Sequence, residues 1–139
     1  MEVGRFMAAA GFGLVISVAA SDAKAQGAPP GFQGAWLSGD KDCAEVYAST
    51  GKGASFKRPV DIFAPAFIIA GNRLRTPQAT CRIKSAKPAG DRRLLILSCA
   101  NAVSDDEVRV LVAAQPDGSL KRFFNEQDEI GTAYRQCSR

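Results

Sequence analysis

The sequence predicts a mainly β fold: a single small antiparallel β-barrel or sandwich of about seven strands, with one short helix and two disulfides. Three observations lead to this prediction. Several short segments alternate apolar and polar residues with period two, which is typical of half-buried strands. Turn signals rich in Gly, Pro, Asn and Asp recur between these segments at short spacing. Finally, the 139-residue chain holds four cysteines, an even number. Short connections favour a meander in which consecutive strands pair.

The first 25 residues resemble a secretory signal peptide. A basic start at Arg5 precedes an apolar core over residues 6–20, which is too short to span a bilayer. The motif Ala23-Lys24-Ala25 has the small-x-small pattern of a cleavage site, which would make Gln26 the first mature residue. We therefore predict a signal peptide over residues 1–25 and a periplasmic or secreted protein.

Two alternatives for the leader remain open: cleavage after Ala20, and an uncleaved membrane anchor. Residues 26–31 are small and Pro-rich, so we predict a flexible linker there and one β domain over residues 32–139. The mature chain of about 114 residues is large enough to bury about two thirds of its unfolded surface. The basic and acidic residues of the leader cancel, so the mature chain keeps the formal net charge of +4 that the whole sequence has.

The first half of the domain alternates between regular and irregular segments. A first strand is predicted over residues 32–37. Asp40 is placed to cap a short helix over residues 41–48, with Glu45 near the helix start. Two prolines make residues 52–65 irregular. A strand over 66–70, a tight turn at Gly71-Asn72 and a return strand over 73–76 then form a hairpin.

Residues 80–99 form the most clearly predicted hairpin. Its first arm alternates Cys81 and Ile83 with basic residues, and its second arm is a short apolar run after the turn Pro88-Ala89-Gly90-Asp91. Folding about this turn brings Cys81 opposite Ser98 or Cys99, near the reach of a disulfide. Three further strands are predicted over residues 107–113, 120–124 and 132–137.

The cysteines predict two disulfides and an oxidising compartment. Hairpin geometry favours Cys81–Cys99, with a stabilisation of about 3 kcal/mol from its short loop. Cys43 would then pair with Cys137 and close most of the domain, for about 4–5 kcal/mol in the chain-entropy model. The sequence alone permits three connectivities.

Catalysis has little support in the composition. The chain contains no histidine, which excludes Ser-His-Asp and Cys-His arrangements. The two acidic clusters, Asp105-Asp106-Glu107 and Glu126 with Asp128 and Glu129, leave a carboxylate-based hydrolase as the remaining enzymatic alternative. We therefore expect a non-catalytic protein with no metal and no cofactor.

Positive charge gathers in the central part of the sequence. Residues 71–100 contain seven basic side chains against Asp91 alone. Alternation should place several on one exposed sheet face, a candidate surface for an acidic protein or an anionic envelope polymer. A solubilising face that blocks edge pairing is the alternative. Nucleic acid is not expected, because the segment lacks interleaved aromatic residues. The candidate basic face consists of Arg73, Arg75, Arg82, Lys84, Arg92 and Arg93.

The segment Phe32-Gln33-Gly34-Ala35-Trp36 contains a G-x-W motif that resembles the start of lipocalin-type barrels. In size the chain is similar to avidins and to bacterial metalloprotease inhibitors of the small-barrel type. The lipocalin resemblance implies that Trp36 plugs one end of a barrel and that an arginine from the last strand, here Arg135, lies over it. The layout of leader, motif and four cysteines also resembles uncharacterised small exported proteobacterial proteins, a resemblance that supplies no function.

Three functions follow as hypotheses. The first is an exported binding module for a protein or an anionic envelope component. The second is a protease or lysozyme inhibitor that presents the loop 52–65, stiffened by Pro59 and Pro65. The third is a carrier of a small apolar ligand inside a barrel. A filled interior with a protruding loop would favour the inhibitor, and a cavity with apolar walls would favour the carrier. The mature chain is expected to have no membrane span, and its oligomeric state stays open.

Overall fold

The computed structural model of the protein describes residues 11, 13–14, 28–50, 53–101 and 103–138. The predicted cleavage site therefore lies outside the described residues, as does most of the leader. Within the described part of the chain, no helix is long and apolar enough to cross a membrane.

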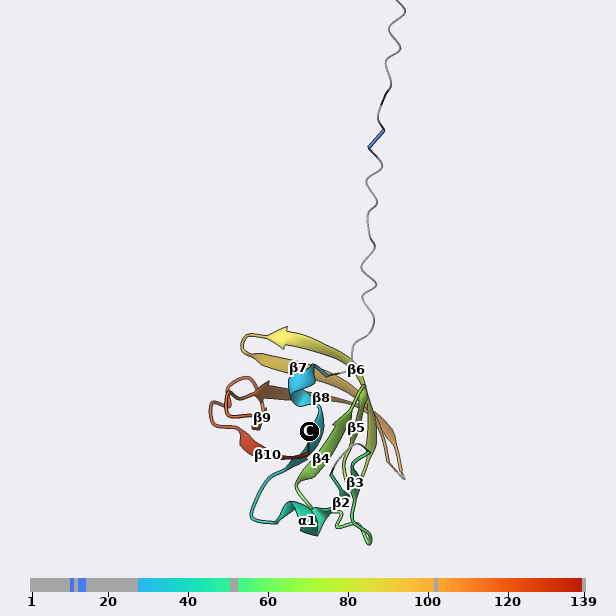
Figure 1. Ribbon diagram of the computed structural model, residues 1–139, viewed down its shortest axis with the longest axis vertical. Helices are drawn as coiled ribbons and strands as arrows, with labels where there is room; N and C mark the ends of the chain where they lie inside the picture. The colour runs from blue at the N-terminus through green and yellow to red at the C-terminus, as the bar shows by residue number, and fades with distance from the viewer. Residues whose placement is uncertain (1–10, 12, 15–27, 51–52, 102, 139) are drawn as a thin grey trace, which may run out of the picture.

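Eight antiparallel strands close into a barrel, which confirms the predicted fold class (Figure 1). Seven of its eight strand contacts join consecutive barrel strands, and β1 closes the sheet by pairing with both β4 and β10. The barrel strands are β1 (Gly34–Leu37), β4 (Ala66–Ala70), β5 (Arg73–Arg75), β6 (Thr80–Ala89), β7 (Arg92–Ala100), β8 (Asp105–Ala114), β9 (Leu120–Phe123) and β10 (Thr132–Ser138). A separate two-stranded sheet holds β2 (Tyr47–Ser49) and β3 (Ser55–Phe56).

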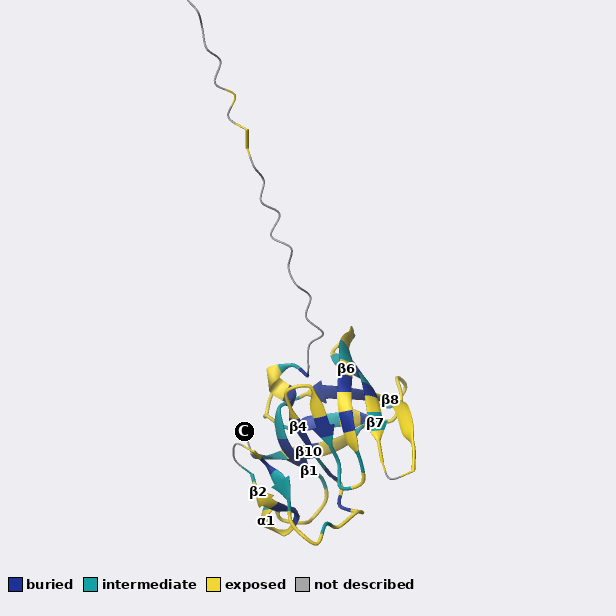
Figure 2. Cartoon of the chain, turned by 90° about the vertical axis from the view of Figure 1, so that its right-hand side faces the viewer, coloured by how far each residue is buried: buried dark blue, intermediate teal, exposed yellow. Residues whose placement is uncertain are grey.

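The β6–β7 hairpin follows the predicted alternation. Cys81 and Ile83 are buried, whereas Arg82 and Lys84 between and after them are exposed, and Figure 2 shows these bands along β6. Cys81 lies directly opposite Cys99, and the two form a disulfide with a Cα–Cα distance of 4.0 Å. This confirms the pairing predicted from hairpin geometry.

The segment that precedes β1 closes one end of the barrel as a plug. The 3₁₀ helix η1 (Pro30–Phe32) packs Phe32 into the same core cluster as Ala28 and Trp36. The Trp36 indole N–H donates to the carbonyl oxygen of Phe32 at 2.9 Å. Of the predicted linker over residues 26–31, residues 26 and 27 lie outside the described residues, Ala28 is 7% exposed and belongs to the core, and η1 begins at Pro30.

The β2–β3 sheet and the helix α1 (Cys43–Val46) cover the outer face of β1 and β4. There the buried residues Leu37 and Ile68 share a second hydrophobic cluster with Val46 and Tyr47. The helix is shorter than the predicted 41–48, because β2 begins at Tyr47. Its N-cap is Asp42 rather than Asp40, and the Asp42 backbone N–H donates to the Glu45 carboxylate at 2.8 Å.

This outer layer explains how the second disulfide forms. Cys43 and Cys137 are joined with a Cα–Cα distance of 5.7 Å, as predicted. β1 and β10 run antiparallel, with Leu37 opposite Arg135, so the chain leaving β1 moves away from Cys137. It then folds back along the outer wall through α1, and both cysteines pack against the outer cluster.

Candidate ligand-binding cavity

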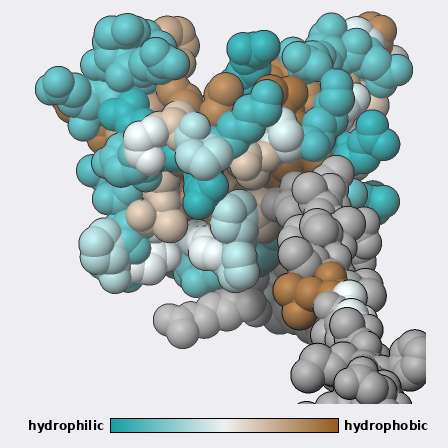
Figure 3. Space-filling model, turned by 90° about the horizontal axis from the view of Figure 1, so that it is seen from above, coloured by the Kyte–Doolittle hydropathy of each residue, from teal (hydrophilic) through white to brown (hydrophobic). Residues whose placement is uncertain are grey.

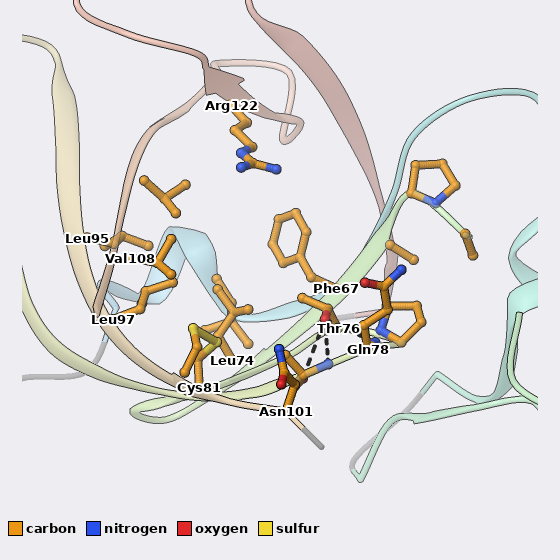
Figure 4. Close-up of a pocket in the computed structure, with 18 of the residues that line it drawn as sticks. Phe67, Leu74, Thr76, Gln78, Cys81, Leu95, Leu97, Asn101, Val108 and Arg122 are labelled. Atoms are coloured by element: carbon orange, nitrogen blue, oxygen red, sulfur yellow. Dashed lines mark hydrogen bonds between the residues drawn. A yellow bond between two sulfur atoms is a disulfide. The ribbon is translucent and has the colours of Figure 1, made fainter. Parts of the chain in front are cut away.

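The barrel interior contains a cavity of about 520 Å³ (Figure 4). Its walls come from β4 to β10, and the inward-facing side chains include Phe67, Leu74, Leu95, Leu97 and Val110. Eight-stranded barrels are narrow enough that side chains can fill them or leave room for one small ligand. This volume places the barrel in the second group, because it lies within the range of about 300–1,000 Å³ typical of ligand pockets.

The cavity opens at the end opposite the η1 plug. In an antiparallel barrel, the connections that follow β1, β5, β7 and β9 leave the strands at one end. Cavity-lining residues come from three of these connections, with Phe63 after β1, Pro77 after β5 and Asn101 after β7. Of the residues known to line the cavity, none lies in the connections after β4, β6 or β8. The mouth is therefore framed by loops, the usual location for residues that contact a ligand.

One side of the wall is incompletely paired. β8 pairs with β7 from Asp105 to Val112, but with β9 only from Leu111 to Ala114. In the described residues, the first half of β8 therefore has no strand on its β9 side. Val108 and Val110 lie on this half, line the cavity and are partly exposed. This gap in strand pairing leaves part of the cavity lining, at Val108 and Val110, partly accessible to solvent.

Arg122 is the one basic residue among the side chains known to line the cavity. It lies on β9, opposite Val112 of β8 and Thr132 of β10. The fully buried Leu120 is two residues away on the same strand, so Arg122 shares its inward-facing side. Figure 4 shows the guanidinium extending into the cavity on the side of Phe67. Among the described residues it takes part in no identified hydrogen bond or ion pair.

Three other polar residues of the lining hold the loops in place. The Gln78 side-chain amide donates to the Ile62 carbonyl oxygen at 2.7 Å. Thr76 accepts hydrogen bonds from the backbone N–H groups of Gln78 and Ala79. On the next loop, the Asn101 side chain accepts from the N–H groups of Val103 and Ser104. These bonds fix the shape of the mouth, whereas within the described part of the chain no hydrogen bond is identified for the Arg122 guanidinium or for the Tyr134 hydroxyl, which also lines the cavity.

Exposed apolar side chains surround the mouth. Phe63 is 82% exposed and Val103 is 92% exposed, on the connections after β1 and β7. Phe124 and Ile130, at 93% and 80%, lie on the connection after β9. The loops at the mouth thus carry the large exposed hydrophobic residues of the described β domain, with Ile62 completing the set. Figure 3 shows a different face, seen from above Figure 1, where hydrophobic residues are also visible between hydrophilic lobes.

The candidate basic face is only partly free. Arg73 and Arg82 lie directly opposite each other on β5 and β6, and both are exposed. Arg75 instead donates to the Ala54 carbonyl oxygen at 2.6 Å, beneath the β2–β3 sheet. Lys84 forms an ion pair with Glu107 at 3.0 Å. The outward alternation is as predicted, but internal contacts occupy two of these four side chains.

Arg92 and Arg93, which follow the turn of the β6–β7 hairpin, lie apart from the other residues of the candidate basic face. The Arg92 guanidinium lies 3.5 Å from the centre of the Phe123 ring, a cation–π contact. It also donates to the carbonyl oxygens of Asn125 and Asp128 in the loop after β9. Arg93 is half-buried and lies on the same side of β7 as Leu95, opposite Val112. Neither residue joins a continuous basic row with Arg73 and Arg82.

Trp36 lies inside the barrel, 1% exposed, but the arginine that the lipocalin resemblance implies does not lie over it. Arg135 instead donates to the carbonyl oxygens of Gly39, at 2.8 Å, and Lys41. The reason is register: Arg135 is opposite the outward-facing Leu37, and a shift of one residue reverses the face. The side chain that stacks on the Trp36 ring is Phe67, and the centres of the two rings are 6.4 Å apart.

The segment 52–65, the candidate inhibitory loop, is tied to the barrel along its described length from residue 53. Besides the Arg75 bond to Ala54 and the Gln78 bond to Ile62, Asp61 forms an ion pair with Lys41 at 2.6 Å. This ion pair lowers the pKa of the Asp61 carboxyl. The segment serves as one side of the cavity mouth.

Each of the two acidic clusters contains a carboxylate that is engaged in local contacts. Asp128 accepts hydrogen bonds from the backbone N–H groups of Phe124, Ile130 and Gly131, which lowers its pKa. Glu107 has a lowered pKa because Lys84 bonds to it. In the described residues, no group of three or more acidic or cysteine side chains could hold a metal ion.

Comparisons with protein families, with curated proteins and with solved structures find no match to this chain. The geometry alone defines it as a closed eight-stranded antiparallel barrel, braced by two disulfides, with a cavity in its interior.

Proposed function

We propose that the protein is a non-catalytic carrier that binds one small, largely apolar ligand inside the barrel. The observation that carries this proposal is the cavity of about 520 Å³, with walls formed mainly by aliphatic and aromatic side chains. An apolar cavity of about 150 Å³ is enough to bind benzene. The cavity in this barrel is more than three times as large as that, which suits a ligand the size of a lipid or an aromatic metabolite.

The surroundings of the cavity support the same function. The Cys43–Cys137 disulfide joins the outer layer to β10 and the Cys81–Cys99 disulfide joins β6 to β7, so two covalent cross-links restrain the cavity walls. A preformed site avoids part of the ordering cost of binding. Eight-stranded barrels of lipocalins and streptavidin hold ligands in this way, an analogy at the level of fold.

The two disulfides fit a compartment outside the cytoplasm. With the predicted signal peptide, this supports a periplasmic or secreted location, where an apolar molecule needs a carrier to move through water. The function preferred from the sequence is binding of an acidic partner. Its remaining support is Arg73 and Arg82, two exposed arginines that lie opposite each other on β5 and β6. The cavity involves many more residues than this pair of arginines, so we base the proposed function on the cavity.

Titration with a neutral naphthylamine fluorophore, whose emission rises in apolar surroundings, tests the proposal. We expect saturable binding with one site per chain. Val110→Trp should abolish it, because Val110 lines the cavity and the indole would occupy the space. Ser98→Trp on β7 is the matched control, since Ser98 is exposed and does not line the cavity. Equal binding by both variants would place the fluorophore outside the barrel and contradict the proposal.

A further inference from the structure

The position of Arg122 bears on which apolar ligands the cavity accepts. Its guanidinium extends into a cavity whose lining is otherwise dominated by apolar side chains. Guanidinium is permanently charged and presents a planar set of donors that matches a carboxylate or phosphate. In the described residues no carboxylate pairs with it. Arg122 is exposed, so a ligand without an anionic group would leave this charge with water as its partner, whereas an anionic group at the same place would pair with it.

The acidic residue of the lining does not cancel this charge. Asp106 lies on β8 six residues before Val112, and Val112 is the residue opposite Arg122. At about 3.3 Å per residue, this separates the two positions by roughly 20 Å along the strand. That is beyond the Debye length of about 8 Å at physiological salt. The Asp106 carboxylate also accepts a hydrogen bond from the Ser104 hydroxyl at 3.0 Å. The cavity is therefore polarised, with positive charge at its β9 wall.

From this arrangement, and resting on the proposed carrier function, we infer that the ligand is an amphipathic monoanion with a single apolar tail. Its acidic group would pair with Arg122, and its tail would lie along Phe67, Leu95 and Leu97. The acidic group next to the gap beside β8 would stay partly in water, which limits the cost of desolvating its charge. A zwitterion or cation would bring a positive group toward Arg122 and would bind less well.

Displacement of the neutral fluorophore by three matched compounds tests the inference: lauric acid, lauryl alcohol and lauryl amine. The three share a tail and differ in the charge of the head. We expect the wild type to bind laurate about tenfold more tightly than the alcohol, the gain typical of one charge-assisted hydrogen-bonded pair. The amine should bind more weakly than the alcohol. A lauryl phosphate arm then distinguishes a carboxylate headgroup from a phosphate one.

The variant Arg122→Gln should remove the preference for laurate over the alcohol, measured as the ratio of the two displacement constants within that variant. Lys121→Gln, on the adjacent outward-facing position of β9, removes the same charge and should keep the preference. Equal affinity of the wild type for laurate and the alcohol, or an unchanged preference in Arg122→Gln, would overturn the inference and leave the carrier function standing. Absence of fluorophore binding by the wild type would instead contradict the carrier function itself.

Discussion

The hydroxyl of Tyr47 donates a hydrogen bond to the carbonyl oxygen of Trp36 at 2.6 Å and lies 3.1 Å from the carbonyl oxygen of Phe67. Tyr47 belongs to the outer layer, whereas Trp36 and Phe67 lie on adjacent barrel strands. The Tyr47 ring also stacks on Phe56, with centroids 5.4 Å apart. One side chain thus joins the β2–β3 sheet to the strands that close the barrel.

Burial raises the pKa of Tyr47 well above its ordinary value near 10. The native state therefore keeps the phenol neutral at a pH where the unfolded chain has lost the proton. The stabilising contribution is complete below about pH 10 and declines above it, by up to about 1.4 kcal/mol per pH unit. Urea unfolding between neutral and strongly alkaline pH should show this decline in the wild type.

The variant Tyr47→Phe isolates this effect. At neutral pH it should lose about 1 kcal/mol, the net value of a hydrogen bond. Above pH 10 its stability should fall less steeply than that of the wild type, because no phenol titrates on unfolding at this position. Parallel curves for the two proteins at alkaline pH would show that the Tyr47 hydroxyl is solvent-accessible and would contradict its burial.

The two disulfides should contribute unequally to stability. Their cysteines are separated by 94 and 18 residues, and the chain-entropy model assigns the larger effect to the longer loop. Replacing Cys43 and Cys137 together by alanine should therefore cost about 4–5 kcal/mol, against about 3 kcal/mol for Cys81 and Cys99. Urea unfolding midpoints of the two double variants would measure the difference. The reverse order would mean that residual structure in the unfolded state, rather than loop length, sets the stabilisation.

Asp128 organises the loop between β9 and β10 through three backbone N–H groups, and its pKa is lowered by these bonds. Its contribution is present above the unfolded pKa near 4 and is lost as the pH falls through the lower native value. Asp128→Asn should therefore be less stable than the wild type at neutral pH, and the difference should shrink in strong acid. Glu126→Gln, with a carboxylate removed from the same loop, should show no comparable loss. Equal unfolding midpoints for the two variants at neutral pH would contradict this role.

The sequence determined the features that depend on neighbouring residues. Alternation in the first arm, an apolar second arm and a Pro-Ala-Gly-Asp turn are enough to predict the β6–β7 hairpin and its disulfide, because register follows from the turn. With that pair assigned, the second disulfide followed by elimination. The short helix was placed within a few residues. Its end could not be predicted, because β2 competes for Tyr47 through contacts with distant strands.

Only the tertiary structure decided the site. In the strand Leu120–Phe123, both alternating faces carry an apolar residue, so the pattern does not show whether Arg122 faces inward. Closure of the barrel puts Leu120 inside, brings the exposed Arg122 into the cavity lining and leaves Phe123 in a buried cluster on the outer face. The same geometry turned Arg135 away from Trp36, because register across β1 and β10 assigns faces residue by residue. Cavity volume depends on the number and stagger of all eight strands, which no local segment specifies.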